Sequence, residues 1–542
     1  MPGFIGPTSV TLSEGTGTCR SGISSKSLKH WDVSPVISLR KGDRGVMGFK
    51  VDSSFLQFLT MGVLGTKRVA ALMRESGMEP IELERYSSCN KIWSTKVKRL
   101  RLPDLLCLRT GVRVEVRAKS KLEIKMSDAP DNRDRRWFAG LRPKDVIAFV
   151  HCRTGDGGEL EIADNAEVFS VSSLLACDEK KTKLGPPKSA SEGAERDRTW
   201  PSTVAKQAGT ARLVSRQRIA AELVTGRRQT YQMRGKTPYV KKGEAFIGES
   251  QFIAGLPDEK LSLADVAGKT WDPRALVESE DKIDRYAAVK ALGHVGREED
   301  LEMLLSVATQ EVDGRVALEA AGGAARLGSQ EGFDRLMSTL REPPEPFLTM
   351  EAVLILTELG REPELRERCG ACLRAVAGDD TYRDSEVRLA ALWGLGKAGC
   401  RDYGYLAGLL GSDNFDEEVH LVSAFGSRLA DDDIDTLVEV LLSAEASDRQ
   451  KSSAAYVLTV ADPSEYVVSR FVDLMTSKNQ RASDWAAAVL GQMPRSCVEQ
   501  HVGDETILRR IRPAQLLSAE LNWTRDAAQS TRLDFVQRQD TF

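Results

Sequence analysis

Apolar residues recur at spacings of three and four along the second half of the chain, in runs that end at a turn. Such spacing places the apolar side chains on one face of an α-helix. A second amphipathic run follows each turn, as EEDLEMLLSVA follows RYAAVKALGHVG. The turns fall 31 to 39 residues apart, at Gly296, Gly328, Gly360, Gly399, Ala430, Ala461 and Met493. We therefore predict about seven helical hairpins over residues 278–511.

The first helix of each hairpin is rich in small residues, which lets neighbouring helices cross closely. Neither helix of a hairpin can bury its apolar face alone, so the hairpins are expected to stack into a right-handed solenoid. These units resemble HEAT repeats, in particular the short repeats of the phycobilisome-lyase type. The resemblance implies a fold and an interaction surface. A bilin-lyase-like enzyme is disfavoured, because the histidines of the array, His294, His420 and His501, form no clear constellation with a nucleophile.

Short alternating runs replace this pattern in the first half of the chain. One amphipathic helix is predicted over residues 53–77, followed by a strand over 79–86. Two further strands are predicted about a turn at 109–111, because apolar and polar residues alternate on both sides of it. Strands over 145–152 and 166–176 are expected to close this α/β unit.

A change of composition follows the α/β unit. Residues 178–205 combine Pro, Gly, Ser and charged side chains and are predicted to form a linker. Beyond it, a helix is predicted over 210–226 and alternating strands over 227–248. This second unit is strongly basic.

The length of 542 residues exceeds what one hydrophobic core fills, since cores stop growing near ~250–300 residues. With 41% hydrophobic and 29% charged residues, the chain is expected to be globular. Its formal net charge of −3 conceals an asymmetry. Residues 1–250 carry 44 Lys and Arg against 28 Asp and Glu, a net of +16, whereas residues 251–542 carry 32 against 51, a net of −19. The basic half therefore suits a phosphate-bearing partner, and the acidic half does not.

The nine scattered cysteines form no disulfide framework, which indicates reduced thiols. The N-terminal residues lack a charged segment followed by an apolar one, and no run approaches the ~20 apolar residues of a membrane span. We expect a cytoplasmic protein with no membrane partner.

Two carboxylates flank the predicted hairpin turn, Asp104 and Glu115, with ten residues between them. A hairpin of this length can bring both side chains to one edge of a sheet. Side chains alternate along a strand, so Glu115, Arg117 and Lys119 share a face. Hydrolysis of a phosphodiester requires a hard cation that neutralises the phosphate and activates a water, and hard cations bind carboxylate oxygens. Two convergent carboxylates and a basic side chain meet that minimal requirement.

This arrangement, PDLLCLRTGVRVEVRAK after a helix and a strand, resembles the PD-(D/E)XK nuclease superfamily, the restriction-endonuclease-like fold. The resemblance implies that Asp104 and Glu115 bind Mg²⁺ or Mn²⁺. Glu82 and Glu84, which share a face of the preceding strand, are the available candidates for a further ligand, and Glu84 is the one we assign. It also implies that Arg117 and Lys119 face the scissile phosphate. Arg117 stands where the family usually has lysine, and this departure weakens the expectation of catalysis because arginine does not exchange its proton with water.

Positive charge interleaved with aromatic residues marks two further segments. One is the loop DAPDNRDRRWFAGLRPKD, and the other runs from Lys206 to Lys242, where ten Lys and Arg accompany a single acid. Such composition indicates contact with phosphates and stacking on bases, although a solvated loop explains the first segment equally well. The candidate nucleic-acid-binding residues are Arg135, Arg136, Trp137, Arg227, Arg228, Tyr231, Arg234, Lys236, Tyr239, Lys241 and Lys242.

The expected fold class is α+β multidomain, with an N-terminal restriction-endonuclease-like α/β domain followed by an all-α HEAT-repeat solenoid. The expected units are an extension (1–45), the nuclease-like domain (46–177), a linker (178–205), a basic α/β segment (206–277), the solenoid (278–511) and a C-terminal cap or tail (512–542).

The function expected from these resemblances is metal-dependent cleavage of DNA in a restriction or antiviral defence system. RNA is not excluded as the nucleic acid. The repeats are expected to bind a protein partner or another copy of the chain. The alternative is a catalytically inactive adaptor, which senses nucleic acid with its basic half and recruits a partner through its repeats. Arg117 and the lack of an acid in the core of the first helix favour this alternative.

Overall fold

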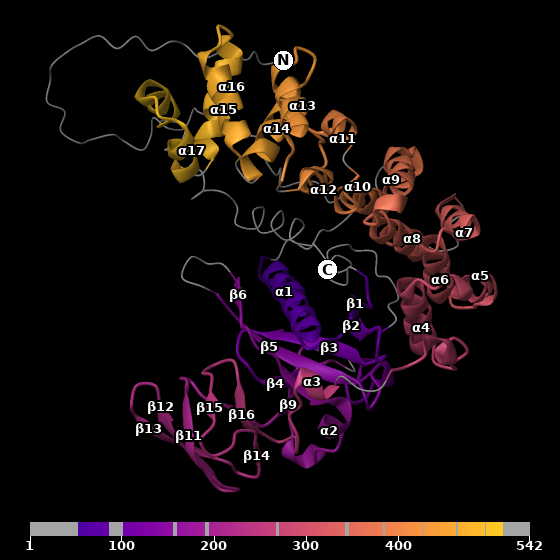
Figure 1. Cartoon of the computed structure of the whole chain (residues 1–542), viewed down its shortest axis with the longest axis vertical. Coiled ribbons are helices and arrows are strands. Elements are labelled where there is room, and N and C mark those ends of the chain that lie inside the picture. The colour runs from indigo at the N-terminus through magenta and orange to yellow at the C-terminus, as the bar shows by residue number, and fades with distance from the viewer. Residues whose placement is uncertain are drawn as a thin grey trace, which may run out of the picture.

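A computed structural model describes residues 53–85, 101–154, 160–189, 194–266, 270–341, 346–382, 385–400, 402–426, 428–461, 464–493 and 495–512. Within these ranges the chain forms a strand-rich N-terminal half and a curved array of helices (Figure 1). The predicted extension over 1–45 and nearly all of the predicted tail over 512–542 lie outside the described residues. No helix in the described ranges is long and apolar enough to cross a membrane.

A mixed sheet forms the centre of the N-terminal half. Helix α1 (Ser53–Glu75) precedes it, as predicted, and the strands β1, β2 and β3 form an antiparallel series. Strand β5 joins β3 in parallel, and β6 and β7 pair with β5 in the antiparallel sense. The strands are β1 (Pro80–Glu82), β2 (Leu105–Cys107), β3 (Arg113–Lys119), β5 (Val146–Thr154), β6 (Leu160–Ile162) and β7 (Glu167–Ser170). The hairpin predicted about residues 109–111 is therefore confirmed.

The two faces of this sheet have different partners. Helix α1 covers one face, where Val69 and Met73 pack against Val114 and Val116 of β3. Because side chains alternate along β3, Glu115, Arg117 and Lys119 lie on the opposite face. That face also carries Ile147 and Phe149 of β5, which pack in a second core with Trp137, Phe169, Trp200 and Phe252.

A three-stranded sheet occupies the region predicted as a linker. Strands β4 (Ile124–Asp128), β9 (Arg196–Trp200) and β8 (Lys183–Pro187) pair in the order β4–β9–β8. Trp200 is buried, and buried Arg198 pairs with buried Asp128 at 2.6 Å. The linker over 178–205 is therefore wrong for residues 183–187, 196–200 and 202–204, which form strands. Its polar composition misleads because β8 is largely exposed, and because a buried ion pair takes the place of an apolar pair in β9.

The basic segment after β9 is built from short strands and not from the predicted helix over 210–226. Ile219, Ala221 and Leu223 alternate into a small core, which is the period of two of a strand and not the helical period predicted for this segment. The Ser215 hydroxyl accepts a hydrogen bond from the Arg218 N–H at 3.1 Å, which closes the turn between the strands over Gly209–Val214 and Arg218–Leu223. The strands are β10 (Ser202–Val204), β11 (Gly209–Val214), β12 (Arg218–Leu223), β13 (Arg228–Gln232), β14 (Thr237–Pro238), β15 (Ala245–Phe246) and β16 (Phe252–Gly255).

Seven successive helix pairs form the array in the described part of the second half, which confirms the predicted hairpins. The first helices of the pairs, called here the inner helices, stack side by side, while α5, α7, α9 and α11 lie on the outside of the arc (Figure 1). The inner helices are α4 (Lys282–Val295), α6 (Gly314–Arg326), α8 (Pro346–Leu359), α10 (Glu386–Lys397), α12 (Phe415–Phe425), α14 (Asp448–Val460) and α16 (Gln480–Gln492). The outer helices are α5 (Leu301–Gln310), α7 (Gln330–Arg341), α9 (Pro363–Gly378), α11 (Tyr403–Leu409), α13 (Asp431–Leu442), α15 (Glu465–Thr476) and α17 (Arg495–His501).

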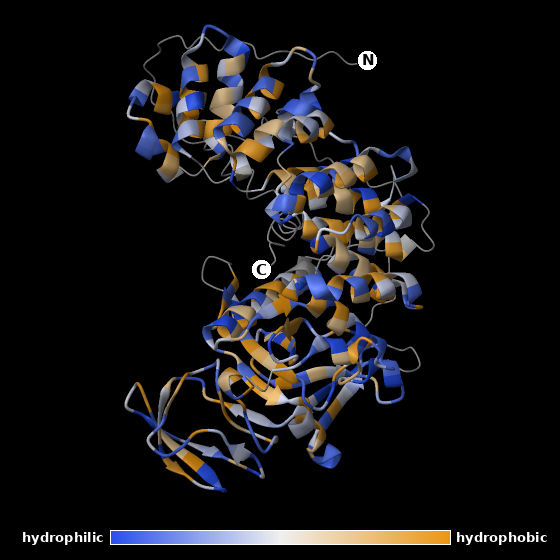
Figure 2. Cartoon of the chain, turned by 45° about the vertical axis from the view of Figure 1, so that its right-hand side comes forward, coloured by the Kyte–Doolittle hydropathy of each residue, from blue (hydrophilic) through white to orange (hydrophobic). Residues whose placement is uncertain are grey.

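Small residues have the two roles predicted for them. Gly296 ends α4 in the left-handed conformation at φ 75°, and its N–H donates to the Leu292 carbonyl. A Cβ atom on Gly293 would lie 2.7 Å from the Gly323 Cα, so α4 and α6 cross too closely for a larger side chain. In Figure 2, hydrophilic and hydrophobic residues alternate around the helices of the array, as the amphipathic pattern requires.

One of the hydrophobic cores extends across both halves. Leu83 and Leu106 of the N-terminal half belong to the same cluster of buried residues as the first inner helices. The Trp271 indole N–H donates to the Leu108 carbonyl at 2.6 Å, next to the β2–β3 turn. Asp284 of α4 pairs with Arg113 of β3 at 3.3 Å. The array is therefore docked on the sheet by both apolar and ionic contacts.

Candidate functional site

The β2–β3 hairpin carries the two carboxylates for which the sequence predicts a metal site. Leu105 pairs with Val114, so Asp104, one residue before β2, lies opposite Glu115. The Leu83 N–H donates to the Asp104 carbonyl at 2.9 Å, and Glu84 follows Leu83 in the chain. The structure thus places Asp104 and Glu115 on neighbouring segments, as the spacing predicts, with Glu84 beyond the end of β1.

Both carboxylates have protein partners. One oxygen of Asp104 accepts the Val116 N–H at 2.7 Å, and one oxygen of Glu115 pairs with the Arg117 guanidinium at 2.7 Å. In the ranges that the structure describes, no group of three or more His, Cys, Asp and Glu side chains is arranged to hold a metal ion. Arg117 therefore lies against the carboxylate that the family resemblance assigns to the metal.

Lys119 is the residue of this face whose pKa is clearly shifted. Burial lowers its pKa, and the neighbouring positive charges of Arg117 and Lys125 lower it further, to about 8, against a smaller opposing effect of Asp197. A lysine with such a pKa is able to exchange a proton near neutral pH, which Arg117 is not.

The two arginines predicted to bind nucleic acid in the loop after β4, Arg135 and Arg136, make contacts within the chain. Arg135 pairs with Glu195 at 2.7 Å, at the edge of the β4–β9–β8 sheet. Arg136 lies 3.5 Å from the buried Asp128 carboxylate and 3.4 Å from Glu179. These ion pairs account for both side chains without a nucleic acid.

The three aromatic residues predicted to stack on bases are part of the cores. Trp137 is buried and makes edge contacts with Phe138 and Trp200. Tyr231 is buried in the core under β12. The half-buried Tyr239 donates its hydroxyl hydrogen to the Pro257 carbonyl at 2.7 Å. Rings packed in this way offer no face to a base, so the stacking role predicted for Trp137, Tyr231 and Tyr239 does not fit the structure.

The predicted basic residues of the strand segment are mostly exposed. Lys236 is the exception, because it is half-buried and its ammonium contacts the Thr203 hydroxyl. The exposed side chains are those of Arg227, Arg228, Arg234, Lys241 and Lys242.

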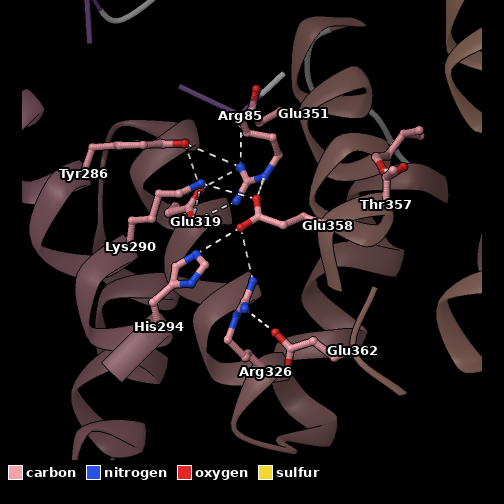
Figure 3. A network of polar contacts seen from close by, with 11 residues as sticks. Arg85, Tyr286, Lys290, His294, Glu319, Arg326, Glu351, Thr357, Glu358 and Glu362 are labelled. Carbon is pink, nitrogen blue, oxygen red and sulfur yellow. Dashed lines mark hydrogen bonds and ion pairs between the residues drawn. The ribbon is translucent and has the colours of Figure 1, made fainter. Parts of the chain in front are cut away.

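A buried ionic network, which the sequence analysis missed, joins the two halves (Figure 3). Arg85, three residues beyond β1, is only 4% exposed and inserts its guanidinium between α4, α6 and α8. It makes a bidentate contact with Glu319, at 2.8 and 2.9 Å, and bonds to Glu351 at 3.1 Å and to Glu358. The Tyr286 hydroxyl donates to Glu319 at 2.8 Å. Three inner helices therefore converge on one arginine from outside the array.

Further basic side chains surround Glu358 on the inner helices. Lys290 lies 3.3 Å from its carboxylate, His294 lies 3.0 Å away and Arg326 lies 3.2 Å away (Figure 3). Arg326 also pairs with Glu362. We refer to these groups as the Arg85 network, which consists of Arg85, Tyr286, Lys290, His294, Glu319, Arg326, Glu351, Glu358 and Glu362.

The pKa shifts in the Arg85 network follow from burial opposed by ion pairing. Burial raises the pKa of the Glu319 carboxyl, but attraction by Arg85 and Lys290 outweighs burial and lowers the pKa to about 2. The same balance holds the pKa of Glu358 well below its usual value. Burial lowers the pKa of His294, and the hydrogen bond to Glu358 only partly opposes this. Both glutamates are therefore charged in the folded protein at neutral pH.

A periodic signal for this network exists in the sequence. Glu319 and Glu351 each lie nine residues before a turn glycine, Gly328 and Gly360. His294, Arg326 and Glu358 likewise each lie two residues before a turn glycine. Charged residues at equivalent positions of stacked, alanine-rich helices are expected to meet. No local signal points to Arg85, whose partners lie more than two hundred residues away in the chain.

The comparison with protein families agrees with the repeat architecture. The family model described as HEAT repeats matches residues 274–357. Together with the seven helix pairs, this match identifies the second half as a HEAT-repeat array. No curated protein matches the chain.

Three solved structures align with less than half of the chain. The complex of CpcE and CpcF of phycocyanin lyase from Nostoc sp. PCC7120 has 19% identity and a TM-score of 0.23, covering 46% of this chain and 96% of that chain. Human deoxyhypusine hydroxylase in complex with glycerol has 17% identity and a TM-score of 0.19. The alignment covers 46% of this chain and 94% of the hydroxylase chain. An engineered protein has 18% identity and a TM-score of 0.17. The alignment covers 44% of this chain and 96% of the engineered chain. The HEAT assignment rests on the family match and the helix pairs, not on these alignments.

Proposed function

We propose that this protein is an adaptor without catalytic activity, in which the HEAT repeats hold a protein partner and the basic half contacts nucleic acid. The contact between Arg85 and the carboxylates of Glu319, Glu351 and Glu358 is the observation that carries this proposal. It supports the view that the inner helices bind side chains presented from outside the array. It also supports a rigid connection between the array and the basic half.

Inner helices further along the array have polar residues at the position that Glu319 and Glu351 occupy, and these are available to a partner. Ser452 of α14 and Asp484 of α16 lie nine residues before their turns, as Glu319 and Glu351 do. Ser452 is half-buried and Asp484 is exposed, whereas Glu319 is buried under Arg85. The inner surfaces of solenoids are extended binding surfaces. We therefore assign the partner to α14 and α16, away from the repeats that hold Arg85.

Site-specific photocrosslinking in the full chain tests this assignment. A photoreactive residue at Ser452 or Asp484 is expected to capture the same protein partner, identified by mass spectrometry. Matched probes at Glu439 of α13 and Asp473 of α15, exposed on outer helices, are expected to capture it at least tenfold less. Equal capture from inner and outer helices, or different proteins at Ser452 and Asp484, would contradict a specific inner surface.

A metal-dependent nuclease is the second candidate function, which we propose because β2 and β3 bring Asp104 and Glu115 together. Helix α1 followed by this antiparallel series is the arrangement that the PD-(D/E)XK resemblance implies, and the lowered pKa of Lys119 suits a proton-transferring role. The ion pair between Glu115 and Arg117 weighs against it, because a metal ion would have to displace a cation already bound.

Plasmid cleavage distinguishes the two functions. The adaptor proposal predicts that purified full-length protein leaves supercoiled DNA uncut with Mg²⁺ or Mn²⁺, as does an Asp104→Asn, Glu115→Gln double variant. Stoichiometric Mn²⁺ binding, measured by electron paramagnetic resonance, is likewise expected to be absent from both. Nicking by the unmodified chain that falls more than 100-fold in the double variant, but not in a Glu123→Gln control, would replace the adaptor by the nuclease.

A further inference from the structure

The outer face of the sheet β13–β12–β11 carries arginines on adjacent strands. Ile219, Ala221 and Leu223 of β12 point into the small core, so Arg218, Ala220 and Glu222 point outward. In the register of β12 and β13, Arg228 lies directly opposite Glu222, so the Arg228 side chain is on the same face of the sheet.

Backbone contacts bring further exposed cations to the borders of this face. The Met233 N–H donates to the Gln217 carbonyl at 2.9 Å, which places Arg234 beside the turn that contains Arg216. The Gly243 N–H donates to the Ala211 carbonyl at 2.7 Å, which places Lys241 and Lys242 beside β11. Four neighbouring chain segments at a strand spacing of ~4.8 Å span about 14 Å. We call this surface, made of Arg216, Arg218, Arg228, Arg234, Lys241 and Lys242, the basic face.

Little of this charge is neutralised within the chain. Glu222 pairs at 3.0 Å with Arg212, and Glu244 accepts the Lys241 backbone N–H at 2.7 Å. In the part of the chain that the structure describes, no side chain of the basic face has an ionic partner. The acidic half of the chain bears the opposite charge but is docked elsewhere, on Arg85, Arg113 and the β2–β3 turn. The basic face is thus free for an anionic partner.

The aromatic residues decide which polyanion fits. Proteins that bind single strands stack bases on exposed aromatic rings. Here Tyr231, Phe246 and Phe252 are buried, and Tyr239 is half-buried with its hydroxyl bonded to Pro257. A surface of cations without an available ring can contact phosphates but lacks the aromatic platforms on which single strands stack their bases.

We infer that the basic face binds the phosphate backbone of duplex nucleic acid without reading its sequence. Duplex DNA carries one charge per ~1.7 Å of axis, and each neutralised phosphate contributes a salt slope of about 0.9, against about 0.7 for a single strand. A surface that gains only from phosphate contact therefore prefers the duplex. This inference rests on the nucleic-acid half of the proposed function and specifies its ligand.

Fluorescence anisotropy of the full-length protein with a labelled 20-base-pair DNA, and with one strand of it, tests the inference. The duplex is expected to bind at least tenfold more tightly than the strand at the same salt concentration. Changing Arg216, Arg218 and Arg228 together to Gln is expected to reduce the slope of log K against log salt by about 2 to 3. A control that changes the exposed Lys180, Lys181 and Lys183 to Gln removes the same charge and is expected to leave the slope unchanged.

The outcomes separate this inference from the function on which it rests. Binding to neither form overturns both the inference and the nucleic-acid half of the proposed function. Equal or tighter binding of the single strand overturns only the preference for the duplex. An equal loss in the control variant overturns the location. Self-association in sedimentation velocity without DNA, abolished by the triple Arg variant, would assign the basic face to the acidic array of a second copy instead.

Discussion

Replacing Arg85 with alanine is expected to lower the local unfolding free energy of α6 and α8 by about 3–5 kcal/mol. The change removes, from the buried Glu319 and the half-buried Glu358, the cation that both carboxylates contact. Removing one partner of a buried ion pair is costly because the remaining charge loses its best counter-ion and does not regain full contact with water. Lys290 stays 3.8 Å from Glu319 and 3.3 Å from Glu358 and compensates only part of this loss. Native-state hydrogen exchange of the full chain measures this loss at the amides of these helices.

An exposed arginine provides the matched control for Arg85. Arg135 pairs with Glu195 at 2.7 Å but is 47% exposed, so Arg135→Ala is expected to change stability by less than about 1 kcal/mol. Combining Arg85→Met with Glu319→Gln is expected to recover part of the loss, because it removes a buried negative charge together with the positive one. Equal effects of Arg85→Ala and Arg135→Ala would show that the network contributes nothing beyond a surface ion pair.

Acid is expected to weaken the ion pair between Arg85 and Glu319 over a defined pH window. The pKa of Glu319 is lowered from 4.5 to about 2, so the unfolded state binds a proton before the folded state does. The contribution of the Glu319 carboxylate to the free energy of unfolding is therefore complete above pH 4.5 and is lost as the pH falls toward 2. A shift of this size corresponds to about 3 kcal/mol, and Glu358 acts in the same direction. Hydrogen exchange of α6 between pH 5 and pH 2.5 measures the loss.

Glu319→Gln separates this titration from general acid unfolding. The variant is expected to be less stable at neutral pH but to lose less stability between pH 4.5 and pH 2.5, because the group that titrates there is gone. His294 acts in a different window, since its lowered pKa makes stability fall below the ordinary histidine value of 6.5. An unchanged pH dependence below 4.5 in Glu319→Gln would contradict the assignment to this carboxylate.

The repeat array was predictable because its determinants are local and recur. The position of Gly296 before a new amphipathic run specifies a helix end, and six further turns at similar spacing repeat it. The opposition of Asp104 and Glu115 was predictable for a similar reason. It depends only on the turn and on alternation along two adjoining strands.

The basic segment shows where local pattern is insufficient. The sequence TARLVSRQRIAAELVTG has apolar residues at spacings of both two and three to four, and a helix was the wrong choice between them. The partners of Ile219 in the small core, such as Met233 and Ile253, lie outside this stretch and favour the strand. Trp137 was misjudged likewise, because its burial depends on Trp200, which lay in the predicted linker.

Local sequence is therefore enough for the helix pairs, the hairpin with its two acids and the charge division between the halves, because each follows from neighbouring residues or a short period. Packing between distant segments is required for the Arg85 network, the burial of the aromatic residues and the resulting composition of the basic face. The physical reason is that a charge or a ring acquires its role from its surroundings. Arg85 and Glu319 are 234 positions apart in the sequence and come together only through the tertiary fold.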